Sequence, residues 1–167
     1  MVALAGKRET IDLQRRNPRG GEEELARELG VPTDGLALLD GSGLSRGSRI
    51  APETLGALLA LAAGHDADPR LRPLVTGLPV AGFSGTLADR FGTAGDGRAG
   101  AGEVRAKTGT LTGVSSLAGV VGRGVDRPPG QFRLLAFAVM TDDVQVSNTL
   151  DARDALDRIA AALGPDG

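Results

Sequence analysis

Three strand-like runs in close succession constrain the fold of this chain more than any other feature. They cover residues 103–108, 114–121 and 132–140, and the last reads Phe-Arg-Leu-Leu-Ala-Phe-Ala-Val-Met. Short runs that are apolar or alternate apolar and polar residues, bounded by glycine- and proline-rich segments, are typical of β-strands. The link at 122–131 contains Pro128-Pro129-Gly130, which indicates a hairpin loop. The sequence therefore predicts an antiparallel sheet in its C-terminal half.

Helical patterns flank these strands. In residues 149–163, one face carries Leu156, Ile159, Ala160 and Leu163, and Gly164-Pro165 stops the helix. Pro52 suits the first position of a helix over 52–63 that Gly64 ends. The remaining expected elements are helices at 22–29 and 69–76, a short strand at 36–39 that leads into a turn at 40–43, and a loop at 92–102. The fold class expected is α/β (α+β), an antiparallel sheet with flanking helices.

Length and composition exclude several kinds of protein. A chain of 167 residues is enough for one domain with a real core, and we expect a poorly patterned segment at 1–21 followed by a single domain at 22–167. The net charge of −2 gives no general attraction to nucleic acid. With no cysteine there is no disulfide and no cysteine-type zinc site, and we expect no metal and no cofactor. We also expect no transmembrane segment and no export signal in this sequence.

The most specific motif is Lys107-Thr108-Gly109-Thr110, at the end of the strand expected at 103–108. Lys-Thr-Gly is the third of three motifs in penicillin-binding proteins and serine β-lactamases. Taken alone, the tripeptide is more simply a turn with an exposed lysine. The first motif, Ser-x-x-Lys, supplies the nucleophile, and it is absent because Lys7 and Lys107 are the only lysines and neither follows a serine by three residues.

Two further segments precede this motif in a consistent order. Residues 39–52 read Leu-Asp-Gly-Ser-Gly-Leu-Ser-Arg-Gly-Ser-Arg-Ile-Ala-Pro, and residues 78–87 read Leu-Pro-Val-Ala-Gly-Phe-Ser-Gly-Thr-Leu. Together with Arg-Ala-Lys-Thr-Gly-Thr-Leu at 105–111, they resemble the D-alanyl-D-alanine carboxypeptidases of the S13 peptidase type, which are low-molecular-mass penicillin-binding proteins. The resemblance covers about residues 31–163. It implies the C-terminal portion of a β-lactamase/transpeptidase-like fold.

Besides the missing Ser-x-x-Lys, the sequence departs from this family at two further places. Ser84 stands where the family usually has Asp. The second motif, Ser-x-Asn, is also missing, because the nearest candidate, Ser147-Asn148, has no spacer and follows the third motif. The chain therefore resembles the C-terminal third of such an enzyme, beginning just beyond the second motif.

The resemblance implies a serine-type carboxypeptidase that trims peptidoglycan peptides and binds penicillin in the cell envelope, outside the cytoplasm. Its partner would be a peptidoglycan stem peptide or a β-lactam. Lys107 would present its ammonium to the site, and the hydroxyls of Thr108 and Thr110 would bind the substrate carboxylate. Gly109 would let the substrate approach the backbone, and the Thr110 N–H would form half of the oxyanion hole. Because the nucleophile motif is absent, we expect this chain alone to be inactive. The alternative is a non-catalytic remnant or a module that binds cell-wall peptides or β-lactams.

Four other features have simpler interpretations. A nucleophile elbow at Ser42 would require Gly at positions 40 and 44, which are Asp and Leu, so a structural turn is expected. His65, the only histidine, lies in a polar loop where we expect it to be solvated. The glycine-rich residues 92–102 precede a strand and lack the Gly-Lys-Ser/Thr ending of a phosphate loop. Asp142-Asp143 is explained by a turn.

Overall fold

The computed structural model describes residues 21–92, 96–123 and 133–164. The chain divides into two compact units, Met1–Gly77 and Leu78–Gly167. The boundary between the two units falls inside residues 22–167, for which the sequence predicts one partial domain. That domain assignment stays a prediction. Within the described residues, no helix is long and apolar enough to cross a membrane.

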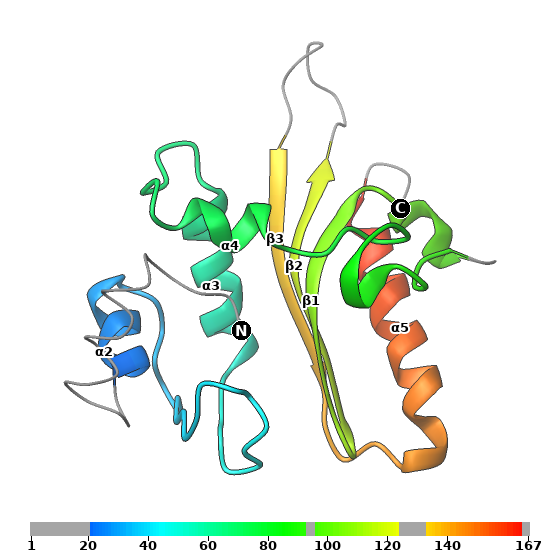
Figure 1. The fold of residues 1–167 in the computed structure, drawn as a ribbon, viewed down its shortest axis with the longest axis horizontal. Helices are drawn as coiled ribbons and strands as arrows, with labels where there is room; N and C mark the ends of the chain where they lie inside the picture. The colour runs from blue at the N-terminus through cyan, green and yellow to red at the C-terminus, as the bar shows by residue number, and fades with distance from the viewer. Residues whose placement is uncertain (1–20, 93–95, 124–132, 165–167) are drawn as a thin grey trace. The chain divides into compact units, whose positions relative to one another are not determined.

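An antiparallel sheet forms the centre of the unit Leu78–Gly167, as predicted (Figure 1). Its strands are β1 (Val104–Leu111), β2 (Val114–Arg123) and β3 (Arg133–Thr141), in the order β1-β2-β3. Thr112 and Gly113 connect β1 to β2, and Gly113 has a φ of 83°, a conformation that glycine adopts without steric cost. Most of the predicted hairpin loop at 122–131 lies outside the described residues.

β1 is longer than the sequence predicts. The strand was expected to end at 108, but it continues to Leu111, so the Lys107–Thr110 motif lies inside the strand. The cause is the pairing with β2, in which Thr110 lies opposite Ser115 and Leu111 opposite Val114. This cross-strand ladder outweighs the weak strand propensity of glycine at position 109.

Helix α5 (Thr149–Ala162) packs on one face of this sheet (Figure 1). Its predicted buried stripe is partly wrong, because Ile159 is 48% exposed. The buried positions are instead Leu156, Asp157, Ala160 and Ala161. Asp157 turns inward to meet an arginine, and the two small alanines allow close packing, so the buried face is rotated away from Ile159. The core cluster consists of Ala81, Leu87, Phe91, Val104, Ala106, Leu117, Val121, Phe137, Leu156, Ala160 and Ala161.

Short 3₁₀ helices complete this unit: η1 (Gly85–Leu87), η2 (Asp96–Gly100) and η3 (Val146–Asn148). The prediction of a plain loop at 92–102 is wrong for η2, which packs against α5. The packing is close at Gly100, where an added Cβ would lie 2.6 Å from the Phe91 ring and 3.2 Å from Ala161 Cβ. Gly100 thus allows close packing of η2 on the core.

The unit Met1–Gly77 contains α2 (Gly21–Glu28), α3 (Pro52–Ala63) and α4 (Arg72–Thr76). The bounds predicted for α3 are confirmed; α2 begins one residue earlier than predicted, and α4 is shorter than 69–76. The strand predicted at 36–39 is wrong, since only a single bridge joins Ala37 to Arg49. Ala62, Leu71 and Leu74 form the small core of this unit.

Candidate functional site

The Lys107–Thr110 motif lies on an edge strand of the sheet. On the side of β1 away from β2, the Ala106 N–H donates to the Pro79 carbonyl at 3.0 Å, and the Ala81 N–H donates to the Val104 carbonyl at 2.9 Å. Backbone groups alternate between the two edges of a strand, so those of Thr108 and Thr110 point to this same outer edge. Within the part of the chain that the structure describes, the bridging to residues 79–81 stops at Ala106. An open strand edge therefore follows, at Thr108 and Thr110.

Lys107 lies at this open edge. Its side chain is exposed, and its ammonium donates a hydrogen bond to the Thr108 carbonyl at 2.8 Å. The positive charge is thus held beside the backbone groups that a strand-like ligand would meet. Because side chains alternate along a strand, Lys107 and Gly109 lie on the sheet face opposite Ala106, which is buried against α5.

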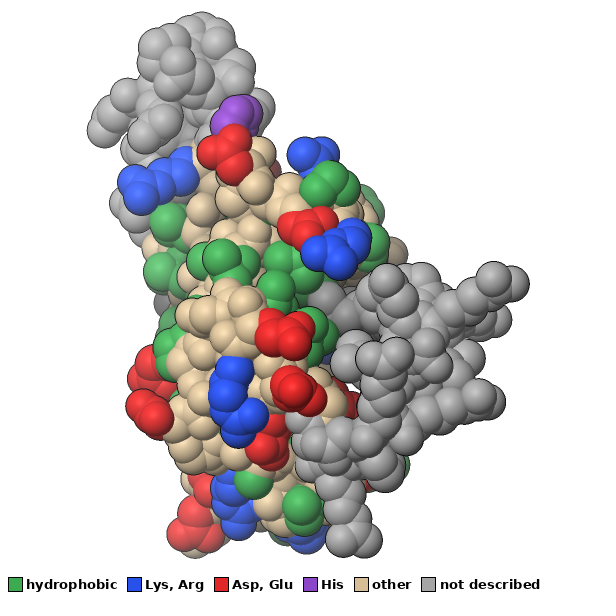
Figure 2. Space-filling view, turned by 90° about the vertical axis from the view of Figure 1, so that its left-hand side faces the viewer, with side chains coloured by type: hydrophobic (Ala, Val, Ile, Leu, Met, Phe, Trp, Pro, Cys, Tyr) green, Lys and Arg blue, Asp and Glu red, His purple; other side chains and the backbone are tan. Residues whose placement is uncertain are grey.

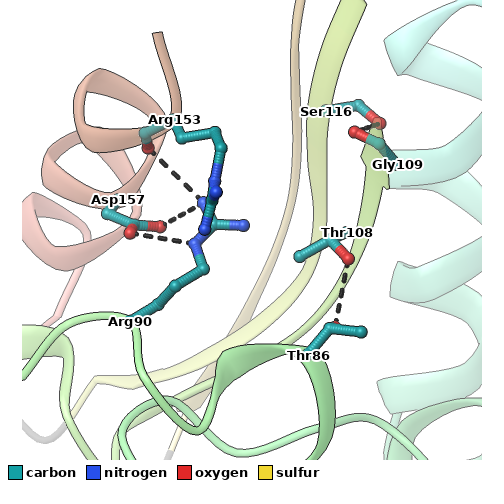
Figure 3. Close-up of polar contacts among 7 residues, drawn as sticks. All are labelled: Thr86, Arg90, Thr108, Gly109, Ser116, Arg153 and Asp157. Atoms are coloured by element: carbon teal, nitrogen blue, oxygen red, sulfur yellow. Dashed lines mark hydrogen bonds and ion pairs between the residues drawn. The ribbon is translucent and has the colours of Figure 1, made fainter. Parts of the chain in front are cut away.

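Gly109 has a close neighbour on the second strand. It lies opposite Ser116 in the ladder, and the Ser116 hydroxyl donates to the Gly109 carbonyl at 3.4 Å (Figure 3). A Cβ added at position 109 would collide with the Ser116 hydroxyl oxygen. Glycine therefore leaves room for the Ser116 hydroxyl in its observed position, in addition to the role in substrate approach that the sequence resemblance implies.

Thr108 is paired with a residue from the segment that precedes the sheet. Its hydroxyl donates to the Thr86 hydroxyl at 3.0 Å, and Thr86 lies in η1 (Figure 3). Two residues earlier, the Ser84 hydroxyl accepts a hydrogen bond from the Val80 N–H at 2.9 Å. Ser84, the position at which the sequence departs from the family pattern, thus still provides an oxygen acceptor that closes the 80–84 turn.

A buried ion pair fixes the end of the same segment. The Arg90 side chain donates to both carboxylate oxygens of Asp157 on α5, from Nε at 3.0 Å and from Nη2 at 2.6 Å (Figure 3). Nη2 also donates to the Arg153 carbonyl at 3.4 Å. Burial raises the pKa of Asp157, while the hydrogen bonds and charge of Arg90 oppose that rise. The pair ties residues 85–90 to α5 in bidentate geometry.

The other residues considered in the sequence do not join this site. Asp40 accepts hydrogen bonds from the Ser42 hydroxyl and the Gly43 N–H, at 2.7 and 3.1 Å, so this segment is a structural turn, as predicted. His65 is exposed, as predicted. The Asp142 carboxylate accepts from the Asp143 N–H at 2.8 Å, which is the turn that was expected.

Charge and metal-binding capacity are modest. Figure 2 shows acidic and basic side chains interspersed over the face in view. Among the residues that the structure describes, no group of three or more His, Asp or Glu side chains could hold a metal ion. The polar groups at the Lys107–Thr110 motif include threonine hydroxyls, the Lys107 ammonium and backbone amides, which suit the binding of a carboxylate or a carbonyl oxygen.

Thr86 and Ser116 are the residues near the motif that sequence reasoning missed. Ser116 could have been found by counting back from a tight turn at Thr112-Gly113, which sets it opposite Gly109. Thr86 belongs to the segment 78–87 that carries part of the family resemblance, but nothing local in the sequence indicates that it meets Thr108. That contact requires the chain to fold back along β1.

The fold is similar to that of penicillin-binding proteins of known structure. The crystal structure of penicillin binding protein 4 from Haemophilus influenzae matches with a TM-score of 0.60 and 25% identity, over 83% of this chain and 29% of that one. The same protein complexed with a novel β-lactam matches with a TM-score of 0.61 and 25% identity, over 81% of this chain and 30% of that one. The transpeptidase-like fold expected from the sequence is thereby confirmed.

The chain belongs to the D-Ala-D-Ala carboxypeptidase 3 (S13) family, which it matches over residues 5–163. It is 44% identical over 137 residues to carboxypeptidase DacB of Mycolicibacterium smegmatis, covering 82% of this chain and 27% of that protein. It is 41% identical over 142 residues to the D-alanyl-D-alanine carboxypeptidase of Actinomadura sp. (strain R39), covering 81% of this chain and 24% of that enzyme. The chain thus spans about a quarter of the length of these relatives, which agrees with the partial resemblance seen in the sequence.

Proposed function

We propose that this chain forms the third-motif wall of a serine-type D-Ala-D-Ala carboxypeptidase site. Lys107 is the third-motif lysine, and Thr108, Gly109 and Thr110 bind the substrate. The observation that carries this proposal is the position of the motif on the open edge of β1, with the Lys107 ammonium 2.8 Å from the Thr108 carbonyl. An extended peptide can pair with such an edge through backbone hydrogen bonds.

The chemistry follows from what these groups offer. A peptide that ends in D-Ala-D-Ala carries a carboxylate, which the Lys107 ammonium and the threonine hydroxyls bind by charge-assisted and neutral hydrogen bonds. The Thr110 N–H points to the outer edge by the alternation of the strand, where it can donate to the oxygen of the scissile carbonyl. Attack on that carbonyl requires a serine and a base to take its proton. These 167 residues contain no Ser-x-x-Lys and no Ser-x-Asn, so we expect the chain alone to bind without turning over.

The proposed partner is a peptidoglycan stem peptide or a β-lactam, in the cell envelope outside the cytoplasm. Support comes from family membership and from the β-lactam complex of the similar Haemophilus influenzae protein. A β-lactam presents a carboxylate beside its reactive carbonyl and can therefore use the same hydrogen-bond donors.

Peptide titration tests the role of Lys107. The chain is titrated with diacetyl-L-lysyl-D-alanyl-D-alanine while amide shifts are followed by NMR. We expect Lys107→Ala to weaken binding about tenfold or more, because a hydrogen bond to a charged group is lost. Lys7→Ala, which removes the only other lysine, is the matched control and should bind as the unchanged chain does. Equal binding by Lys107→Ala and the unchanged chain would contradict the proposal.

The absence of Ser-x-x-Lys favours a second candidate, a non-catalytic binding module for the same ligands. Intact-mass spectrometry after incubation with benzylpenicillin tests the expectation of inactivity that both candidates share for this chain. Neither candidate gives a covalent adduct, because Ser-x-x-Lys is absent from these 167 residues. An acyl adduct at any serine would show that the chain carries its own nucleophile and would overturn the expectation of inactivity.

A further inference from the structure

We propose that Thr86 is a positioning residue that orients the Thr108 hydroxyl toward the carboxylate of the bound peptide. This inference rests on the proposed function, in which Thr108 binds that carboxylate. Thr86 itself does not touch the ligand in this arrangement; it acts through the hydroxyl–hydroxyl hydrogen bond with Thr108, whose oxygens are 3.0 Å apart.

A threonine hydroxyl at an open strand edge has no fixed direction of its own. Its proton rotates, and the side chain can change rotamer when the surroundings leave room. Thr108 is only half-buried, so packing alone does not hold its hydroxyl. The contact with Thr86 supplies the missing restraint, because it fixes the position of the Thr108 oxygen, and the hydrogen bond lies in an exposed setting that a ligand can reach.

Thr86 can provide this restraint because its own backbone is anchored on both sides. Immediately after it, Leu87 is fully buried in the core, and its carbonyl accepts the Gly82 N–H at 2.9 Å. Before it, the Ser84 hydroxyl closes the turn with Val80. Thr86 is therefore presented by a rigid turn, so little conformational entropy is lost when it orients Thr108.

The Arg90–Asp157 pair holds this turn on the body of the unit. It joins the segment that follows η1 to α5 over a separation of 67 residues, and both side chains are buried. Phe91, next to Arg90, has a φ of 64°, which is costly for a bulky residue, yet its ring is buried in the core. The packing around this segment thus overcomes local backbone strain, as expected of a fixed anchor.

The two hydroxyls can act as a relay when a carboxylate binds. Thr108 must then donate its proton to the ligand, so Thr86 must become the donor to Thr108, which both rotating hydroxyls allow. A hydroxyl that accepts one hydrogen bond donates a stronger one, because hydrogen bonds in a chain polarise one another. The contribution of Thr86 should therefore be larger for ligands with a free carboxylate than for ligands with a neutral amide, because a charged acceptor forms the stronger hydrogen bond.

The test compares Thr86→Val, which keeps the shape but removes the hydroxyl, with Thr86→Ser, which keeps the hydroxyl. Binding of diacetyl-L-lysyl-D-alanyl-D-alanine and of its C-terminal amide is measured by NMR titration of the full chain. We expect Thr86→Val to weaken binding of the acid about three- to tenfold, the range for one net hydrogen bond, and to weaken binding of the amide less. Thr86→Ser should bind the acid like the unchanged chain.

A second measurement needs no ligand. Side-chain scalar couplings of Thr108 report its χ1 rotamer, which should be single in the unchanged chain and in Thr86→Ser, and averaged in Thr86→Val. A single rotamer in Thr86→Val, or an equal loss of affinity for acid and amide, would overturn the inference. If the unchanged chain does not bind the peptide at all, the proposed function fails, while the couplings still decide whether Thr86 positions Thr108.

Discussion

The two compact units of this chain are held together in different ways. In Leu78–Gly167, the strands pair over their full length, and α5 closes a core that draws on β1, β2, β3 and η1. In the described part of Met1–Gly77, short helices and a single bridge surround a small core of Ala62, Leu71 and Leu74. The ion pairs of the two units also differ in burial. The Arg90–Asp157 pair of Leu78–Gly167 is buried, whereas in the Arg27–Glu23 pair of Met1–Gly77 the Arg27 side chain is 61% exposed.

This difference indicates which unit can hold the groups of a binding site in a fixed geometry. A strand edge that receives a ligand must hold its backbone groups in place, and long-range pairing with a packed helix provides that rigidity. The motif Lys107–Thr110 lies in the unit with that architecture. The N-terminal unit depends on local helices, whose stability in isolation is marginal at these lengths. The following changes test this contrast.

The largest effect is expected for Arg90→Met. Removing the guanidinium leaves the Asp157 carboxylate buried without its partner, which costs about 3–5 kcal/mol of the free energy of unfolding. Arg27→Met, in the other unit, breaks an exposed pair four residues apart and should cost about 0.5 kcal/mol or less. Urea unfolding followed by far-ultraviolet circular dichroism measures both, since the chain has no Trp or Tyr. Similar losses in the two variants would contradict the contrast.

Acid should reduce the loss of unfolding free energy that Arg90→Met causes relative to the unchanged chain. Burial already raises the pKa of Asp157 above its ordinary value of 3.8, and without the opposing hydrogen bonds of Arg90 it rises further. A carboxyl whose pKa is higher in the folded state favours folding fully below its unfolded pKa, and this contribution is lost as the pH rises through the folded pKa. This loss should therefore be smallest below about pH 4 and grow toward pH 7. If the loss of unfolding free energy in Arg90→Met does not change with pH, Asp157 is not left charged and buried in that variant.

The second-largest loss of unfolding free energy is expected for Gly119→Ala in the central strand, β2. An added Cβ would lie 2.6 Å from Ala106 Cα and would collide with the Arg105 carbonyl oxygen, so β1 must move. Overpacking of this kind costs about 1–3 kcal/mol, and the upper end applies because the obstacle is backbone. Gly56→Ala, inside α3 and with nothing within 4 Å of the added atom, should instead stabilise by about 0.5–1 kcal/mol. Hydrogen exchange, which reports each unit separately, should show opposite signs in the two units.

The smallest effect is expected for Ser84→Ala. The change removes the acceptor for the Val80 N–H and should lower stability by about 1 kcal/mol or less, because the site is exposed to water. Ser84→Asp restores an oxygen at the position where the family usually has Asp, and its stability should match that of the unchanged chain. If Ser84→Ala and Ser84→Asp lower the melting temperature equally, the side-chain oxygen at position 84 is not the feature that closes this turn.

Much of the fold could be predicted from local patterns. The bounds of α3 and the existence of α5 follow from helical periodicity and from Pro52 and Gly164, and the three strands follow from strand-like runs. The errors occur where distant residues decide. Ile159 fits the apolar stripe of α5 but is exposed, because Asp157 turns toward Arg90, which lies in another segment. Residues 36–39 form only a bridge, because no neighbouring strand among the described residues extends the pairing.

The sequence by itself determined the family and the motif Lys107–Thr110, because these depend on residue types at fixed spacing along the chain. Only the tertiary structure decided that this motif continues through Gly109 within β1 and that Thr86 meets Thr108 across 22 residues of sequence. It also decided that Arg90 and Asp157, 67 residues apart, form a buried pair. Local propensity acts over a few residues, whereas a hydroxyl pair or an ion pair exists only after the chain has brought distant segments within about 3 Å of each other.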